Sequence, residues 1–257
     1  FNGDLASGCA DNRQVLEDCE QAIYYIHVPQ NGPRELLSVT LNGDGTTTNT
    51  SILVNPPNNH IGLTADGNTL YMVGNGNVNT FDLGSATVTN TANIATAEGD
   101  NLSGFPAAVV GGDGTLYAGN SSEGQIYTID PVSGLAAPFG PSVDVNGGDL
   151  IFAPTGEEGE DELWIITRND NEFTRVSDGV SFTVDVNEIN GAVTLENGNV
   201  LLADGNGEGL FKEIDLNADG AVVATYETGL ELFNGDLAGA CVDPDPNTSN
   251  PCLAEGA

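Results

Sequence analysis

Three aspartates in this sequence share one local context and could supply ligands to a metal ion. Asp4, Asp149 and Asp236 each stand between a glycine and a leucine. Clustered carboxylates without basic partners attract hard cations, and Ca²⁺ takes six to eight oxygen ligands. If the three converge, they form a candidate calcium site. Alternatively, each aspartate caps its own turn by accepting backbone N–H groups, as Asx side chains commonly do.

Other chemistry has less support in the residues. The only histidines are His27 and His60, so a Ser-His-Asp arrangement finds no sequence support, although His60 falls near the register of the aspartates. A lactonase-type metal site would need carboxylates and amides that converge, and Asp4, Asp149 and Asn190 could partly supply them. We therefore predict no catalytic residues and keep a metal-dependent hydrolase as an alternative.

Two further acidic segments resemble cation sites but favour simpler interpretations. Residues 215–220 match the opening of a D-x-N-x-D-G calcium loop, but the twelfth position is Tyr226. We expect a plain hairpin turn there. Residues 157–162 carry five acids in a loop, which is typical of a solvated tip.

The elements that would position these residues repeat along the chain. Most units have an Asp-Gly or Asn-Gly turn between apolar runs, and these dipeptides favour type I′ hairpins because both central residues need positive φ. Each unit contains a short first strand of small residues, an apolar second strand, an alternating third strand and a polar fourth strand. The second strands are predicted at residues 23–26, 70–73, 116–118, 163–166 and 200–203.

Four strands per unit and no long helix predict an all-β protein, a β-propeller of five four-stranded blades, with six blades as the open variant. We expect the blades at residues 1–57, 58–103, 104–146, 147–188 and 189–232. A β-sandwich would not explain a four-strand period that is repeated five times. The first strands are predicted at residues 3–7, 60–65, 107–111, 148–153 and 191–195.

One unit carries a recognisable pattern, DG-x-LY followed by IYTID-x-x-x-G, at residues 113–117 and 126–134. It resembles the secreted bacterial propellers of the YVTN, NHL and lactonase-like superfamily, and the resemblance covers Asn59 to Thr228. Members of that superfamily include lactonases, adhesins and surface-layer proteins. The resemblance therefore implies the fold and leaves the function open.

A duplication joins the two ends of the chain. Residues 1–6 and 233–238 are both Phe-Asn-Gly-Asp-Leu-Ala, and each copy is followed by a cysteine pair. Residues 233–257 thus form a surplus hairpin beyond a propeller domain at 1–232. One hairpin would close the ring and the other would contact a neighbouring subunit, or the chain was cut from a longer tandem protein. The sequence does not decide which hairpin closes the ring.

The cysteines predict two local disulfides, Cys9–Cys19 and Cys241–Cys252, because each pair brackets one hairpin loop. Disulfides favour an oxidising compartment, and a zinc site is disfavoured because no CxxC spacing is present. The chain starts at Phe1 without a Met, so we expect a processed or excised segment.

Composition limits the partners. Asp and Glu number 38 against 5 Lys and Arg, for a net charge of −33. Such a surface repels nucleic acid and anionic membranes and favours dissolved cations. No run reaches the roughly 18 apolar residues of a membrane span. We expect an extracellular or cell-surface location.

These observations predict a structural surface module that self-associates head to tail, as a filament subunit or as one repeat of a tandem-repeat protein. The alternatives are a metal-dependent lactonase-like hydrolase and an adhesive, ligand-binding propeller. Calcium is the only cofactor that the residues suggest.

Overall fold

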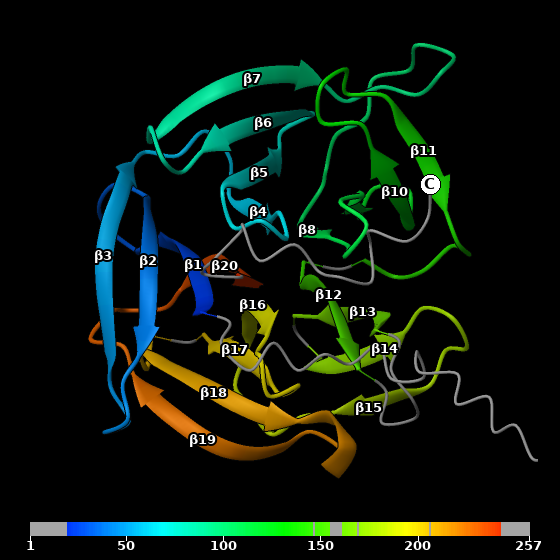
Figure 1. Ribbon diagram of the computed structural model, residues 1–257. Coiled ribbons are helices and arrows are strands. Elements are labelled where there is room, and N and C mark those ends of the chain that lie inside the picture. The colour runs from blue at the N-terminus through cyan, green and yellow to red at the C-terminus, as the bar shows by residue number, and fades with distance from the viewer. Residues whose placement is uncertain (1–19, 146, 155–160, 169, 206, 243–257) are drawn as a thin grey trace, which may run out of the picture.

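The computed structural model describes residues 20–145, 147–154, 161–168, 170–205 and 207–242. These residues form five separate antiparallel sheets of four strands each, arranged as blades around a central axis (Figure 1). The prediction of an all-β, five-bladed β-propeller is confirmed. The one helix in these segments is η1 (Leu216–Ala218), so the described residues contain no helix that could span a membrane.

Every blade has the same radial order of strands (Figure 1). The innermost strands are β4 (His60–Leu63), β8 (Ala107–Val110), β12 (Asp149–Pro154), β16 (Ile189–Thr194) and β20 (Asn234–Val242). The second strands are β1 (Glu20–Val28), β5 (Thr69–Gly74), β9 (Leu116–Asn120), β13 (Asp161–Thr167) and β17 (Val200–Asp204). The third strands are β2 (Glu35–Leu41), β6 (Asn77–Asp82), β10 (Gln125–Ile129), β14 (Glu172–Arg175) and β18 (Leu210–Asp215). The outermost strands are β3 (Thr47–Val54), β7 (Thr87–Asn93), β11 (Ala136–Phe139), β15 (Ser181–Thr183) and β19 (Ala221–Glu227).

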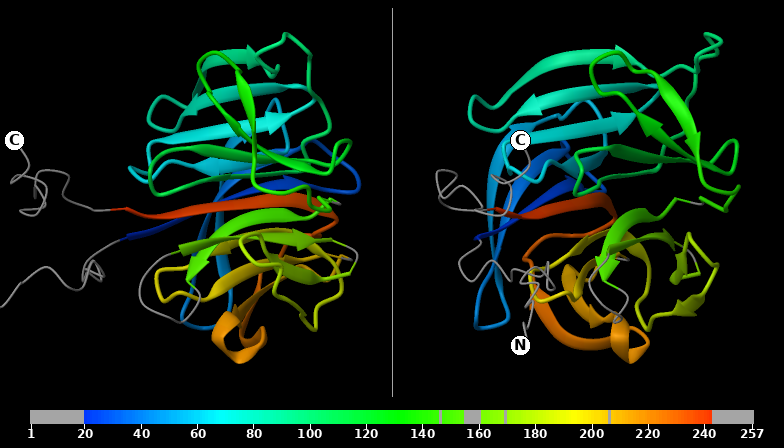
Figure 2. Two further views of the ribbon diagram at one scale, coloured as in Figure 1. Left: turned by 90° about the vertical axis from the view of Figure 1, so that its right-hand side faces the viewer. Right: turned by 45° about the vertical axis from the view of Figure 1, so that its right-hand side comes forward.

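The first blade is completed by the far end of the chain. Strand β20 pairs with β1 over nine residues, with Asn234 opposite Val28 and Val242 opposite Glu20. The two strands lie side by side in both views of Figure 2. We had expected residues 3–7 as the inner strand of this blade. The structure has the second copy of the duplicated segment there instead, and residues 1–19 lie outside the described residues.

The hairpins between first and second strands occur where Asp-Gly and Asn-Gly predict them, but their turn type differs from the expected type I′. Only the glycine has positive φ, for example 68° at Gly67 and 83° at Gly114. The aspartate stays in the negative-φ region, and its side chain accepts a backbone N–H two residues on, as Asp113 does from Thr115 at 2.9 Å. The Asx interaction therefore sets these turns, with the glycine in the left-handed position that closes them.

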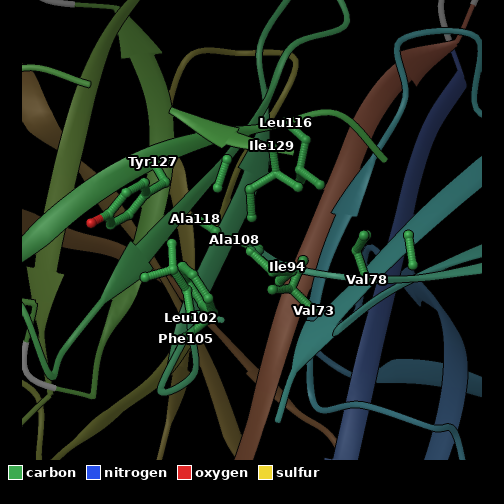
Figure 3. Close-up of a cluster of buried hydrophobic side chains, with 12 residues drawn as sticks. Val73, Val78, Ile94, Leu102, Phe105, Ala108, Leu116, Ala118, Tyr127 and Ile129 are labelled. Atoms are coloured by element: carbon green, nitrogen blue, oxygen red, sulfur yellow. The ribbon is translucent and has the colours of Figure 1, made fainter. Parts of the chain in front are cut away.

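Apolar packing joins neighbouring blades. Among the described residues there is one buried cluster at each of the five blade interfaces. Figure 3 shows the cluster between the second and third blades, where Val73 and Val78 face Leu116 and Ile129. Because each blade buries one face against each neighbour, the ring depends on every interface being filled.

Candidate functional site

A polar residue stands within the first three positions of four of the five inner strands. These residues are His60 in β4, Asp149 in β12, Asn190 in β16 and Asp236 in β20. Asp149 and Asp236 are each 1% exposed, and Asn190 is 4% exposed. A propeller gathers the starts of its inner strands at one end of the central channel, and this geometry brings the four polar side chains to that end.

The two aspartates hold neighbouring blades together. Asp236 Oδ2 accepts a hydrogen bond from the backbone N–H of Ile61 in the next blade, at 2.6 Å. Asp149 Oδ2 accepts one from Ala192 N, also in the next blade and also at 2.6 Å. Asp149 Oδ1 additionally accepts from Leu150 N. The Gly-Asp-Leu context therefore marks a carboxylate that caps the inner strand of the following blade, a role between the two interpretations that the sequence offered.

The carboxyl groups of Asp149 and Asp236 lie close enough to affect each other's pKa. Burial is the main reason that the pKa values of both groups lie well above the usual range, and the proximity of Asp236 raises the pKa of Asp149 further. Two carboxyl groups in contact cannot both ionise without strong repulsion, so the pair retains a proton.

His60 completes this end of the channel as a neutral ring. Its Nδ1 lies 3.7 Å from Asp236 Oδ2, and 19% of its side chain is exposed. Burial lowers its pKa to about 4, against a smaller opposing effect of Asp149. At neutral pH the imidazole is uncharged, so it does not offset the charge of the carboxyl pair.

The predicted metal centre involves Asp4, Asp149 and Asp236. The structure brings Asp149 and Asp236 together, whereas Asp4 lies outside the described residues. Both described aspartates use oxygens for backbone amides, and within the described segments no three His, Cys, Asp or Glu side chains are arranged to hold a metal. The visible donors do not fit the six to eight oxygens of a calcium shell. Calcium at this position stays a prediction.

Three residues at this end have buried polar atoms without a hydrogen-bond partner. These atoms are Nδ2 and Oδ1 of Asn190, Oδ1 of Asp236 and Nδ1 of His60. Such groups cost free energy to bury, so they mark the place where a small polar species would be best accommodated.

A cavity of about 1030 Å³ begins directly behind this polar end. All five inner strands line it, and the lining starts one residue after the polar positions, at Ile61, Leu150 and Leu237. The walls are mostly Gly, Ala, Val, Leu and Ile. At the other end the lining ends in hairpin residues that include Glu196 and Asn197. The channel is thus lined mainly by apolar side chains, but its accessible surface is polar as well as apolar, with buried polar side chains just beyond one end and polar hairpin residues at the other.

The remaining predicted sites are distributed over other parts of the fold. Residues 215–220 form a turn around η1, in which Asp215 Oδ1 accepts from Asn217 N, in line with the expected plain turn. Residues 155–160 lie outside the described residues, and so does most of the acidic loop predicted there. The two disulfides also depend on residues outside them, namely Cys9, Cys19 and Cys252, so both pairings stay predictions.

Two buried carboxylates, Asp204 and Glu213, are not among the predicted site residues. Lys212 Nζ lies 2.6 Å from Asp204 Oδ2, and the Asp204 side chain is fully buried. Glu213 accepts hydrogen bonds from Asn197, Asn199 and Tyr226. The ion pair of Asp204 could have been suspected from the sequence, because Lys212 is the only lysine in the chain and lies in a predicted strand.

Comparison with known proteins supports the fold and identifies no family. No family model and no curated protein matches the chain. A chain in a nidogen/laminin complex structure is 10% identical over 86% of this chain and 98% of that one, with a TM-score of 0.52. A periplasmic gluconolactonase of Pseudomonas aeruginosa is 13% identical over 87% of this chain and 100% of that one, with a TM-score of 0.46. A hydrazine synthase chain of Kuenenia stuttgartiensis is 17% identical, with a TM-score of 0.43; the match covers 66% of this chain, which spans only 49% of that one.

Proposed function

We propose that this propeller binds a small, largely apolar molecule in its central channel. The observation that carries the proposal is the cavity of about 1030 Å³ enclosed by all five inner strands. Ligand sites are concave and mostly apolar, with volumes of roughly 300–1,000 Å³ and a few polar groups that fix orientation. The channel has this character, with apolar walls and polar groups concentrated at its ends.

The residues of the wall restrict the chemistry of the ligand. Leu63, Val109 and Val193 present hydrocarbon to the cavity, so the ligand needs an apolar part that covers these side chains. Glu196 lies at the hairpin end, and the net charge of −33 disfavours anions. The best fit is a neutral or cationic amphipathic molecule whose apolar part enters the channel.

A metal-dependent, lactonase-like hydrolase is the second candidate. The unpaired polar atoms of Asn190 and of Asp236, which is one member of the carboxyl pair, support it. Against it, both aspartates are almost completely buried and already bound to backbone amides. Binding without turnover therefore has the better support. Titration of the protein with Ca²⁺, followed calorimetrically, tests the second candidate, and a stoichiometric heat lost in Asn190→Ala would favour it.

The channel proposal is tested with Nile red, a neutral apolar dye whose fluorescence rises when it leaves water. We expect saturable binding to the folded protein. Val109→Trp places a large side chain in the channel and should abolish that binding. Val88→Trp is the matched control, because Val88 lies on outer strand β7 and is 43% exposed. Equal binding by both variants, or no saturable binding to the parent protein, would contradict the proposal.

We also propose an extracellular setting, supported by the acidic surface and the two local cysteine pairs. Peptide mapping under non-reducing conditions tests it. Recovery of Cys9–Cys19 and Cys241–Cys252 linkages in protein isolated from its native source is the expected result. Free thiols at all four positions would argue against an oxidising compartment.

A further inference from the structure

A second cavity lies between the third and fourth blades, and it has a volume of about 270 Å³. Phe139 at the end of β11 lines it from the third blade, and Phe152, Asp161, Leu163 and Val176 line it from the fourth. It is here called the aromatic pocket. Phe152 and Asp161 also line the central channel, whereas Phe139 lines only the aromatic pocket. A change at Phe139 therefore addresses this pocket and leaves the channel wall intact.

Three aromatic rings are packed together at this pocket. The ring centroid of Tyr117 lies 4.9 Å from that of Phe139 and 5.3 Å from that of Phe152, and both contacts are edge to face, at 75° and 67°. Phe139 is 37% exposed, and it is the one aromatic residue among the exposed large hydrophobic side chains of the described segments. Below the rings, Leu163 and Val176 are buried. The pocket is thus an apolar cavity bordered by aromatic rings.

Carboxylates stand next to the rings. Asp161 is in the lining of the pocket. A Cβ at Gly111 would lie 3.1 Å from Asp113 Oδ1, 3.2 Å from Tyr117 Cε2 and 3.4 Å from Phe152 Cε2. The Asp113 carboxylate and two of the three rings therefore converge on one point beside the pocket.

Basic side chains do not balance these acids. Among the described residues that line the pocket there is no Lys or Arg. Each described basic side chain has a partner elsewhere: Arg34 with Asn59, Arg168 with Glu188, Arg175 with Asp178 and Lys212 with Asp204. Glu162, which also lines the pocket, helps to raise the pKa of Arg175, so its charge is partly offset. The pocket keeps an excess of negative charge beside its rings, and this charge is complementary to a cation.

From this arrangement we infer that the aromatic pocket binds a small organic cation with an alkylated head, such as a quaternary ammonium group. Aromatic rings attract a cation through their quadrupole, and quaternary ammonium groups are recognised in proteins by sets of such rings. A primary ammonium is strongly hydrated and suits an apolar cavity less well.

The chain already contains a cation–aromatic contact in the fourth blade, where Arg175 Cζ lies 5.6 Å from the centre of the Trp164 ring. The volume of the pocket is close to the lower limit of ligand sites, roughly 300 Å³, so one head group fits and a large ligand does not. This site is independent of the proposed channel ligand.

Choline is the probe, and its control is the neutral alcohol in which a tert-butyl group replaces the trimethylammonium group. The two have nearly the same shape and differ in charge. At matched ionic strength the parent protein should bind choline saturably, with one molecule per chain, and about tenfold or more tighter than the alcohol. Phe139→Leu keeps an apolar side chain but removes a ring, and it should weaken choline binding by about fivefold or more. Val132→Ala changes a side chain of the same blade that is 76% exposed, and it should bind choline as the parent does.

Isothermal titration calorimetry measures the affinities, and saturation-transfer NMR on the choline methyl signal checks that the ligand contacts the protein. Thermal melting confirms that the variants are folded. Phe139→Leu keeps the net charge of the chain, so it separates a built site from general attraction of cations to an acidic protein. Equal affinities of the parent for choline and the neutral alcohol would overturn the inference, and that comparison needs no variant. Choline binding that is unchanged in Phe139→Leu, or no saturable binding to the parent, would overturn it as well.

Discussion

Four blades of this propeller and the remaining one are built in different ways. Each of the four is a continuous stretch of chain whose strands are joined by short turns, whereas the first blade takes three strands from the beginning of the chain and one from the end. Tyr25 and Asn234, which bond in that blade, are 209 residues apart. A local hairpin forms at a small entropic cost, but a pairing over such a distance requires closing nearly the whole chain. The closing strand is therefore the part of the ring whose stability most depends on its own specific contacts.

Asp149 and Asp236 show the same difference between a blade of continuous chain and the blade that is closed by the end of the chain. Both carboxylates cap the inner strand of the next blade, and the two meet at the axis. Asp149 is part of a blade that forms from local hairpins. Asp236 is brought in by the closing strand, so the same interaction ties the end of the chain to the second and fourth blades.

The largest expected change in the free energy of unfolding comes from substitution of Gly235, for which Gly3 in the other copy is the control. Gly235→Val puts a branched side chain against the Ile26 carbonyl oxygen and should destabilise the closed ring by roughly 3 kcal/mol or more. Gly3→Val, the same change in the other copy, should change the free energy of unfolding by less than about 0.5 kcal/mol, because Asn234–Val242 is the closing strand in the structure. Urea unfolding followed by tryptophan fluorescence measures both, with Trp164 as the only tryptophan. Equal losses in the two variants would show that both copies contribute to closure.

A smaller effect is expected from the carboxyl pair and depends on pH. Between the ordinary carboxyl pKa, near 4, and the raised values of Asp149 and Asp236, the folded protein holds a proton that the unfolded chain has released. The free energy of unfolding therefore falls as pH rises through this window. His60 acts in the opposite direction from pH 4 to 6.5, because its pKa falls to about 4 on folding.

Asp236→Asn keeps an oxygen for Ile61 N but cannot ionise. As pH increases above the ordinary carboxyl pKa near 4, the variant should lose less stability than the parent, and above pH 6.5 His60 no longer contributes to the difference. The difference can reach about 1.4 kcal/mol per pH unit while one proton is being released. Urea unfolding at pH 6.5, 7.5 and 8.5 measures it. Parallel curves for the two proteins would mean that the pair does not titrate in this range.

Salt should have the smallest effect on stability, and this effect should not be confined to one blade. Screening reduces repulsion among 38 acidic groups that face 5 bases, so the melting temperature should rise between low salt and 1 M NaCl. Because these charges are spread over all blades, the rise should be the same in the parent and in Asp236→Asn. A much larger rise in one of them would connect the closing strand to the surface charge.

The strands of the ring could be predicted because each depends on nearby residues. The fourth strand at residues 47–54 and the third at 35–41 were located by alternation and turn chemistry alone, and the structure has the same bounds. The closing strand could not be chosen from its own sequence, since residues 1–6 and 233–238 are identical and the selecting contact is between Gly239 and two residues of other strands. The shared context of Asp149 and Asp236 singles them out, but their amide partners lie in the next blade. The bond of Asp236 to Ile61 exists only after the ring has closed.

Hydrogen–deuterium exchange with peptide-level mass spectrometry tests the closure of the ring most directly. In the full-length protein, peptides covering 234–242 should be protected to the same degree as those covering β1, and Gly235→Val should remove the protection from both while leaving β9 and β10 protected. Rapid exchange of 234–242 alongside a fully protected β1 would contradict closure by the C-terminal strand.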